Sequence, residues 1–208
     1  MHIKLVVFDL DGTLVDSKED IYNHLCKTLE HFSKPIPEKD HVTGLIGSGA
    51  RGLLANFFED KELDKALDVF RKIYHQNPVN LSKPFPEIVK TLETLLLRGF
   101  ILGVLTNKQE SLGRKILGSL GLDFFFACII GSDTFGKRKP SPDSLLYTLK
   151  MFSLEAQESI LIGDTQNDQL CAKGAGANFA HAKWGYGKSE SDISLETPSK
   201  LLQLLGIN

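Results

Sequence analysis

Three features are scarce in this 208-residue sequence: cysteine, an excess of charge of one sign, and long apolar runs. Three cysteines stand far apart and form no CxxC pair, which excludes a disulfide framework and favours reduced thiols in a cytoplasmic protein. The 24 basic and 26 acidic residues nearly balance, so the charge indicates neither a nucleic-acid partner nor a disordered acidic tail. The apolar run Leu5 to Phe8 is too short for a signal peptide or a membrane span. We therefore expect a cytoplasmic protein that binds neither nucleic acid nor membrane and works as a monomer or homodimer.

Internal repeats and low-complexity segments are also absent, and the apolar pattern divides the chain. Ile3 to Asp9 is typical of a short buried strand. From Pro84 onward, helical stretches alternate with four further strands, expected at 100–106, 127–131, 159–164 and 178–181. This alternation predicts the α/β class, with a parallel sheet and helices on both faces.

A helix-rich segment separates the first strand from the alternating region. Apolar residues recur at helical spacing from Ile21 to Phe32, and Ser17 is suited to begin that helix. A glycine-rich turn at 44–49 and two more helical stretches follow. We predict two domains: an α/β core made of residues 1–14 and 84–208, and a helical cap inserted at residues 15–83.

Four groups of polar residues follow expected strands or lie just beyond them, at the edge where open α/β sheets bind ligands. These groups are Asp9-Leu10-Asp11-Gly12-Thr13, Thr106-Asn107-Lys108, Lys139-Pro140-Ser141-Pro142 and Gly163-Asp164-Thr165-Gln166-Asn167-Asp168. Each group alone has a simpler interpretation as a turn, a helix cap or a solvated lysine. Their convergence on one edge of one sheet is much more specific than any single group.

The first three groups supply parts for chemistry on an anion. The turn after the first strand exposes the carboxylates of Asp9 and Asp11. Thr106 and Asn107 offer a hydroxyl and an amide as hydrogen-bond donors. Lys139 precedes an expected helix N-terminus, where anions are stabilised.

The fourth group is suited to a metal ion. Asp164 ends an apolar strand, and Asp168 follows one helical turn later, so both carboxylates can face one site. Carboxylate oxygens with room for water molecules suit Mg²⁺. The sequence therefore predicts a nucleophile, an acid, a cation and metal ligands in one place.

In this order and spacing, the four groups resemble those of the haloacid dehalogenase superfamily of phosphohydrolases. The stretch from Asp9 to Ile21, DLDGTLVDSKEDI, resembles the phosphoglycolate phosphatase-like branch in particular, and the resemblance covers essentially the whole chain. It implies a Rossmann-like core with strand order 3-2-1-4-5 and an inserted helical cap. It also implies a Mg²⁺-dependent phosphatase that hydrolyses a small phosphorylated metabolite, a phosphoglycolate-like monoester, through an aspartyl-phosphate.

The resemblance implies a role for each matching residue. Asp9 would be the nucleophile and Asp11 the general acid and base. Thr106 and Lys139 would hold the phosphate, together with backbone N–H groups near Asn107.

The same resemblance implies a metal site. Mg²⁺ would be bound by the carboxylates of Asp9 and Asp164 and by the backbone carbonyl of Asp11. Thr13 and Asp168 would support this arrangement.

The helical segment is less informative. Arg51 lies just beyond the glycine-rich turn, where it would either pair with a substrate carboxylate, whose geometry favours arginine, or begin a helix and face water.

Other functions also fit part of the pattern. A sugar phosphomutase of the same superfamily keeps both acids. A signalling receiver domain and a binding protein without turnover belong to a different class. The inserted helices argue against the receiver domain, and the intact acid set argues against the binding protein.

Overall fold

A six-stranded sheet organises most of the chain in the computed structural model, which describes residues 2–207. Its strand order is β5-β4-β1-β6-β7-β8, and every pairing is parallel. The strands are β1 (Leu5–Phe8), β4 (Ile101–Leu105), β5 (Cys128–Ile130), β6 (Ser159–Gly163), β7 (Asn178–Ala182) and β8 (Ser194–Leu195). Counted along the chain, β1, β4, β5, β6 and β7 are the first to fifth strands of the sheet, so they confirm the predicted order 3-2-1-4-5.

The sixth strand, β8, is a correction to the five-stranded prediction. It has only two residues and lies in a polar stretch without an apolar run, so no periodicity marks it. Two backbone hydrogen bonds nevertheless attach this segment to β7, from His181 N to the Ile193 carbonyl and from Lys183 N to the Leu195 carbonyl, both about 3 Å long.

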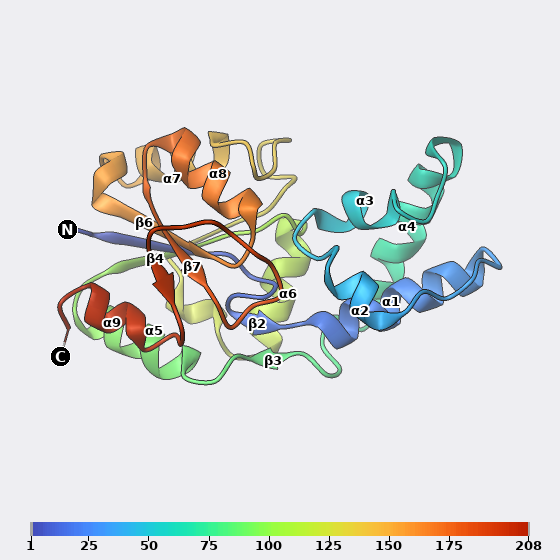
Figure 1. Cartoon of the computed structure of the whole chain (residues 1–208), viewed down its shortest axis with the longest axis horizontal. Helices are drawn as coiled ribbons and strands as arrows, with labels where there is room; N and C mark the ends of the chain where they lie inside the picture. Colours follow the sequence, from blue (N-terminus) through green and yellow to red (C-terminus); the bar gives the residue numbers. More distant parts are fainter. Residues whose placement is uncertain (1, 208) are drawn as a thin grey trace.

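Helices cover both faces of the sheet (Figure 1). On one face lie α5 (Ile88–Leu97), α6 (Glu110–Ser119) and α9 (Lys200–Leu204), and on the other lie α7 (Asp143–Met151) and α8 (Gln166–Ala175). Short 3₁₀ turns, Asp123–Phe125 and Ala156–Glu158, precede β5 and β6. Because successive strand residues point to opposite faces, Val6 and Phe8 pack with the first group of helices and Leu5 and Val7 with the second. This double coverage explains why β1 is apolar throughout and buried at all four positions.

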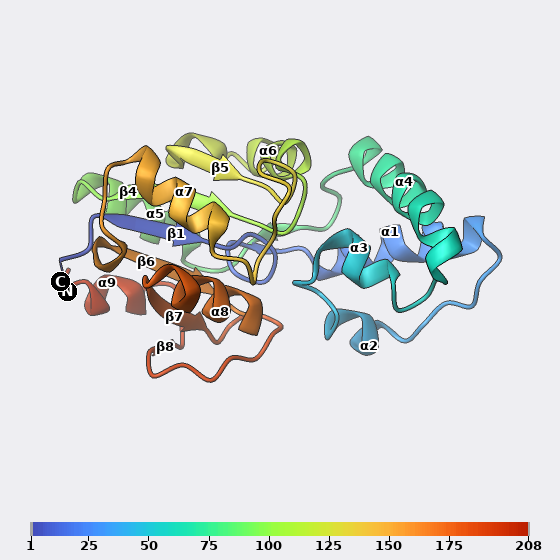
Figure 2. The same ribbon diagram turned by 90° about the horizontal axis from the view of Figure 1, so that it is seen from above.

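Four more helices lie together beyond one end of the sheet, as both ribbon views show (Figures 1 and 2). They are α1 (Lys18–His31), α2 (Lys39–Thr43), α3 (Gly49–Leu54) and α4 (Asp60–Gln76), and we call residues 17–82 the helical lobe. Leu25, Leu54 and Phe70 are among its buried residues. The short helix α2 was not predicted, because it spans five residues and buries only Val42.

A two-stranded antiparallel ribbon carries both connections between the helical lobe and the sheet. It pairs β2 (Val15–Asp16) with β3 (Lys83–Pro84), so the outgoing and returning chain segments run side by side. The division of the chain into a core and a cap at residues 15–83 stays a prediction, and the ribbon lies at both of its proposed boundaries.

A buried carboxylate fastens the returning segment next to this ribbon. Asp20 accepts backbone N–H bonds from Asn80, Leu81 and Ser82, at 2.8–3.1 Å, and a 2.5 Å bond from the Ser82 hydroxyl. Burial raises the pKa of Asp20, but the hydrogen bonds from Ser82 and its neighbours outweigh burial, and the net pKa is lowered. Asp20 therefore holds the returning segment, just before β3, as a charged group.

The three cysteines are free. Across residues 2–207, none of the helices combines the length and apolarity needed to cross a membrane.

Candidate active site

The carboxyl ends of the central strands meet at one edge of the sheet. Phe8 of β1 is in register with Val104 of β4 on one side and with Ile162 of β6 on the other. Asp9, the residue after β1, therefore lies beside the residues that follow β4 and β6. This is the edge where parallel sheets present ligand-binding groups.

Lys139 joins the acids of this edge. Its ammonium donates to Asp9 Oδ1 and contacts Asp168 Oδ1, both at 2.6 Å, and donates to the Leu105 carbonyl at 2.7 Å. Burial lowers the pKa of this lysine, but Asp168 and Asp9 raise it by more, so Lys139 is held as a cation. The structure thus brings the predicted cation directly to the predicted nucleophile.

Three buried carboxylates surround this single ammonium. Asp9, Asp164 and Asp168 each place an oxygen within 4.8 Å of the others. Burial raises the pKa of Asp9 well above its ordinary value despite Lys139, and burial together with Asp168 raises the pKa of Asp164 to about 6. The site has more acidic groups than its one lysine neutralises, which is the donor chemistry that suits a hard divalent cation.

Asp164 is held from behind by backbone donors. Its Oδ2 accepts the N–H groups of Tyr186 and Gly187, both at 2.9 Å, whereas within residues 2–207 its Oδ1 accepts only a long 3.4 Å bond from the Thr13 hydroxyl. A side chain at Gly12 would lie 2.8 Å from the Asp164 carboxyl carbon. One oxygen of Asp164 is therefore free to bind a cation, in a position that only glycine at residue 12 permits.

Asp168 is more fully engaged. Its Oδ2 accepts the Thr165 N–H at 3.0 Å and the Thr165 hydroxyl at 2.6 Å, and the first of these bonds is one half of a capping box at the start of α8. Its other oxygen contacts Lys139. Asp168 is thus placed to orient Lys139, which agrees with a supporting role.

Asp11 lies beside Asp9 in sequence but has different partners. Its carboxylate accepts a 2.6 Å hydrogen bond from the Ser17 hydroxyl and contacts the Lys108 ammonium at 3.1 Å. Lys108 also donates to the Tyr74 hydroxyl at 3.3 Å and lies 4.4 Å from the centre of the Tyr74 ring. Because Tyr74 belongs to α4, this chain of contacts links the acid of the sheet edge to the helical lobe.

The remaining predicted donors lie close by with different partners. Thr106 is buried, and its hydroxyl accepts the Lys108 N–H at 3.1 Å. Asn107 accepts the Lys139 N–H at 2.8 Å and donates to the carbonyls of Lys139 and Gly47 at 3.0 and 2.9 Å. The Asn107 side chain therefore positions Lys139 and the glycine-rich turn of the helical lobe, and its role as a phosphate ligand stays a prediction.

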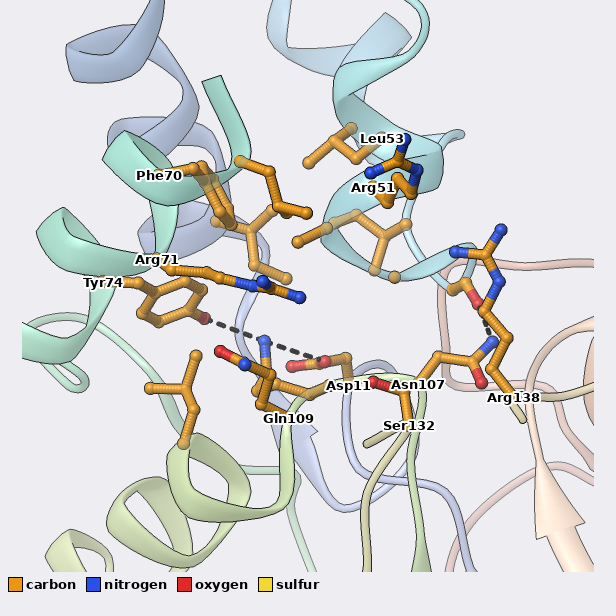
Figure 3. Close-up of a pocket in the computed structure, with 18 of the residues that line it drawn as sticks. Asp11, Arg51, Leu53, Phe70, Arg71, Tyr74, Asn107, Gln109, Ser132 and Arg138 are labelled. Carbon is orange, nitrogen blue, oxygen red and sulfur yellow. Dashed lines mark hydrogen bonds and ion pairs between the residues drawn. The ribbon is translucent and has the colours of Figure 1, made fainter. Parts of the chain in front are cut away.

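A cavity of about 640 Å³ lies between the sheet edge and the helical lobe. Asp9, Asp11 and Asn107 line it, and Figure 3 shows Asp11 and Asn107 opposite the helices of the lobe. Arg51 also lines it, but its guanidinium pairs with Asp64 at 2.6 Å and is about half exposed. The predicted pairing of Arg51 with a substrate stays a prediction.

Several residues around the site were missed by sequence reasoning. Lys108 was part of a recognised group but received no role, and Tyr74 and Arg71 look like ordinary residues of an amphipathic helix. Tyr186 lies in a loop that carried no prediction, although the neighbouring glycines of Gly185-Tyr186-Gly187 were a signal of close backbone approach.

Comparisons with known proteins agree with this geometry. The family model described as haloacid dehalogenase-like hydrolase matches residues 6–182. A phosphoglycolate phosphatase of Aquifex aeolicus is 44% identical over 98% of this chain and 97% of its own length, and phosphoglycolate phosphatase 1 of Pseudomonas aeruginosa is 35% identical over 97% and 77%. A crystal structure of a predicted phosphoglycolate phosphatase from Haemophilus somnus superposes with a TM-score of 0.91 at 28% identity and covers 99% of both chains.

Proposed function

Because this chain belongs to the family of haloacid dehalogenase-like hydrolases, we propose that it hydrolyses phosphoglycolate or a closely similar phosphomonoester, using Asp9 as its nucleophile. The chain is a phosphatase. The substrate proposal rests on the names of its relatives. The observation that carries the site assignment is the contact between the Asp9 carboxylate and the Lys139 ammonium at the carboxyl end of β1.

Asp9 is suited to attack phosphorus. Lys139 occupies its Oδ1, and within residues 2–207 no hydrogen bond engages its Oδ2. In the first step a carboxylate oxygen forms a bond to phosphorus while the bond between phosphorus and the ester oxygen breaks, which gives an aspartyl-phosphate. Lys139 and the Thr106 hydroxyl would stabilise the charge on the phosphoryl oxygens.

Asp11 would move the proton in both steps. It gives a proton to the leaving alkoxide, and then takes one from the water molecule that attacks the aspartyl-phosphate and releases inorganic phosphate and the Asp9 carboxylate. Ser17 and Lys108 hold the Asp11 carboxylate in place for this exchange. Positioned general acid–base catalysis of this kind is worth about 10²–10⁴ in rate.

The acids fit a magnesium ion, which we propose as the cofactor. Asp9 and Asp164 would hold it with the backbone carbonyl of Asp11, which accepts no hydrogen bond within residues 2–207, and Thr13 and Asp168 would support these ligands. When bound, a divalent cation reduces the repulsion between a carboxylate nucleophile and an anionic phosphate and orients the two groups.

We propose that residues 15–83, which are the helical lobe and its two connections, act as a cap that closes over the cavity. Tyr74 and Asn107 already connect it to the sheet edge through Lys108 and Gly47. Closure would exclude water from the first step. We further propose that the enzyme acts in the cytoplasm, as a monomer or homodimer.

The test is release of inorganic phosphate from phosphoglycolate and from p-nitrophenyl phosphate by the purified chain with Mg²⁺. Asp9→Asn removes the nucleophile with little change of shape and is expected to abolish turnover of both. Asp123→Asn, at an exposed position away from the site, serves as the matched control. Near wild-type turnover by folded Asp9→Asn, with the amide verified by mass, would refute the assignment.

A further inference from the structure

Arg71 of α4 lines the cavity and has no charged partner among residues 2–207. Its guanidinium extends from the helix toward the middle of the cavity, beside Tyr74 (Figure 3). Within residues 2–207, no ion pair or side-chain hydrogen bond includes Arg71, and its Nε is fully buried without an acceptor. A buried donor that finds no acceptor is costly, so its presence in a native fold calls for an explanation.

The other cations around the cavity differ from Arg71. Arg51 pairs with Asp64, and Lys108 contacts both Asp11 and Tyr74. Arg138 is exposed to solvent, whereas Arg71 is partly buried. Among the cavity-lining cations in the described part of the chain, Arg71 is therefore the one that is both partly buried and available to an entering anion.

The surroundings of Arg71 favour a strong interaction with such an anion. Ile21, Leu67 and Phe70 also line the cavity on the side of the helical lobe, and apolar neighbours strengthen a charge-assisted hydrogen bond. A planar guanidinium presents two parallel N–H groups, which match the two oxygens of a carboxylate.

We propose that Arg71 is a specificity-determining residue that binds the carboxylate of the substrate while its phosphate lies at Asp9 and Lys139. This inference rests on the proposed function, and it adds that the enzyme selects phosphomonoesters that carry a carboxylate. It assigns this role to Arg71 in place of Arg51, whose charge is already paired. It also gives α4 a direct contact with bound substrate.

The experiment compares kcat and KM on phosphoglycolate and on ethyl phosphate, which has the same ester but no carboxylate. Arg71→Met keeps the length of the side chain and removes the charge, Arg71→Lys keeps the charge, and Lys72→Ala changes the exposed neighbour as a control. We expect Arg71→Met to lower kcat/KM on phosphoglycolate about 10- to 100-fold, mainly through KM. Ethyl phosphate turnover should be little changed, and Arg71→Lys should recover part of the loss.

Equal losses on both substrates in an Arg71→Met protein with unchanged circular dichroism would overturn the inference. A selective loss in Arg51→Ala but not in Arg71→Met would overturn it as well. If the wild type hydrolyses p-nitrophenyl phosphate but no carboxylate-bearing phosphoester, the inference fails together with the proposed substrate, while the phosphatase activity and the role of Asp9 stand. If the wild type hydrolyses none of these esters, the proposed function itself fails.

Discussion

Replacing Lys139 by methionine should destabilise the metal-free protein strongly. The lysine side chain is only 3% exposed and contacts Asp9 and Asp168 at 2.6 Å. Removing one partner of a buried ion pair costs about 3–5 kcal/mol, because the remaining charge is left without compensation. Asp9, whose pKa burial already raises, can take up a proton and limit this cost. We therefore expect a loss of about 3 kcal/mol near pH 7, which is a large part of the ~5–15 kcal/mol that stabilises an ordinary domain.

The measurement is urea unfolding in EDTA, followed by circular dichroism and by the fluorescence of Trp184. The double variant Lys139→Met/Asp168→Asn removes charge from both sides, so it should be more stable than Lys139→Met alone. Lys183→Met is the matched control, because its partner Glu196 is exposed and such surface pairs contribute less than about 1 kcal/mol. A loss below about 1 kcal/mol in Lys139→Met, or a double variant less stable than the single one, would show that the buried charges are not coupled in this way.

Excess EDTA should abolish phosphate release and added Mg²⁺ should restore it; full activity in EDTA would rule out the proposed metal site. In the metal-free protein, burial raises the pKa of Asp164 from an ordinary 3.8 to about 6. Between these two pH values the folded state keeps a proton that the unfolded chain releases. The free energy of unfolding should therefore fall by about 3 kcal/mol as the pH rises from 4 to 6. Asp164→Asn should show a flatter profile, and an equally steep one would count against this origin. Asp11→Ala should lower kcat about 10²–10⁴-fold on an ester with a poor leaving group, measured in steady state, and an unchanged rate would contradict its role. Gly185→Ala should lower the free energy of unfolding, measured by thermal unfolding, by about 1–3 kcal/mol, because its new methyl would lie 2.7 Å from the Asp164 carboxyl carbon. Gly44→Ala is the control, because its methyl would make only ordinary contacts. Equal effects of the two substitutions would refute the packing argument.

The central strands and the sheet-edge residues could be predicted from sequence because both depend on short-range patterns, whereas the strand order was implied only by the resemblance to the haloacid dehalogenase superfamily. Each central strand is a short buried apolar run, and the polar group that follows it marks its carboxyl end. Given that order, parallel pairing of β1 with β6 brings Asp9 and Asp164 together, as the register of the two strands shows.

The contacts that hold the acids could not be predicted in the same way. Tyr186 donates its backbone N–H to Asp164, and its hydroxyl accepts the N–H of Ser17 at 2.7 Å, across a separation of 169 residues. No local periodicity encodes such a pairing, because the loop that carries Tyr186 has no apolar repeat. Ser17 shows the same limit: it stands at the start of α1 as expected, but its hydroxyl binds Asp11 and makes no capping bond.

The arginines of the helical lobe show a third limit. The glycine-rich turn drew attention to Arg51, and no local pattern indicated that its side chain pairs with Asp64, thirteen residues further along. Arg71 stood inside an amphipathic helix with no distinguishing neighbour. Only the three-dimensional structure shows that Arg71, like Arg51, lines the cavity.

The ribbon of β2 and β3 makes the helical lobe exchangeable as a unit. Asp16 and Lys83 are paired across adjacent antiparallel strands, so a two-residue hairpin turn is enough to connect them when residues 17–82 are removed. A different insertion that keeps the pairing of Asp16 with Lys83 would leave the path of both strands unchanged. If the lobe selects the substrate as proposed, recombination at this point would exchange selectivity while it leaves the acids of the sheet edge unchanged.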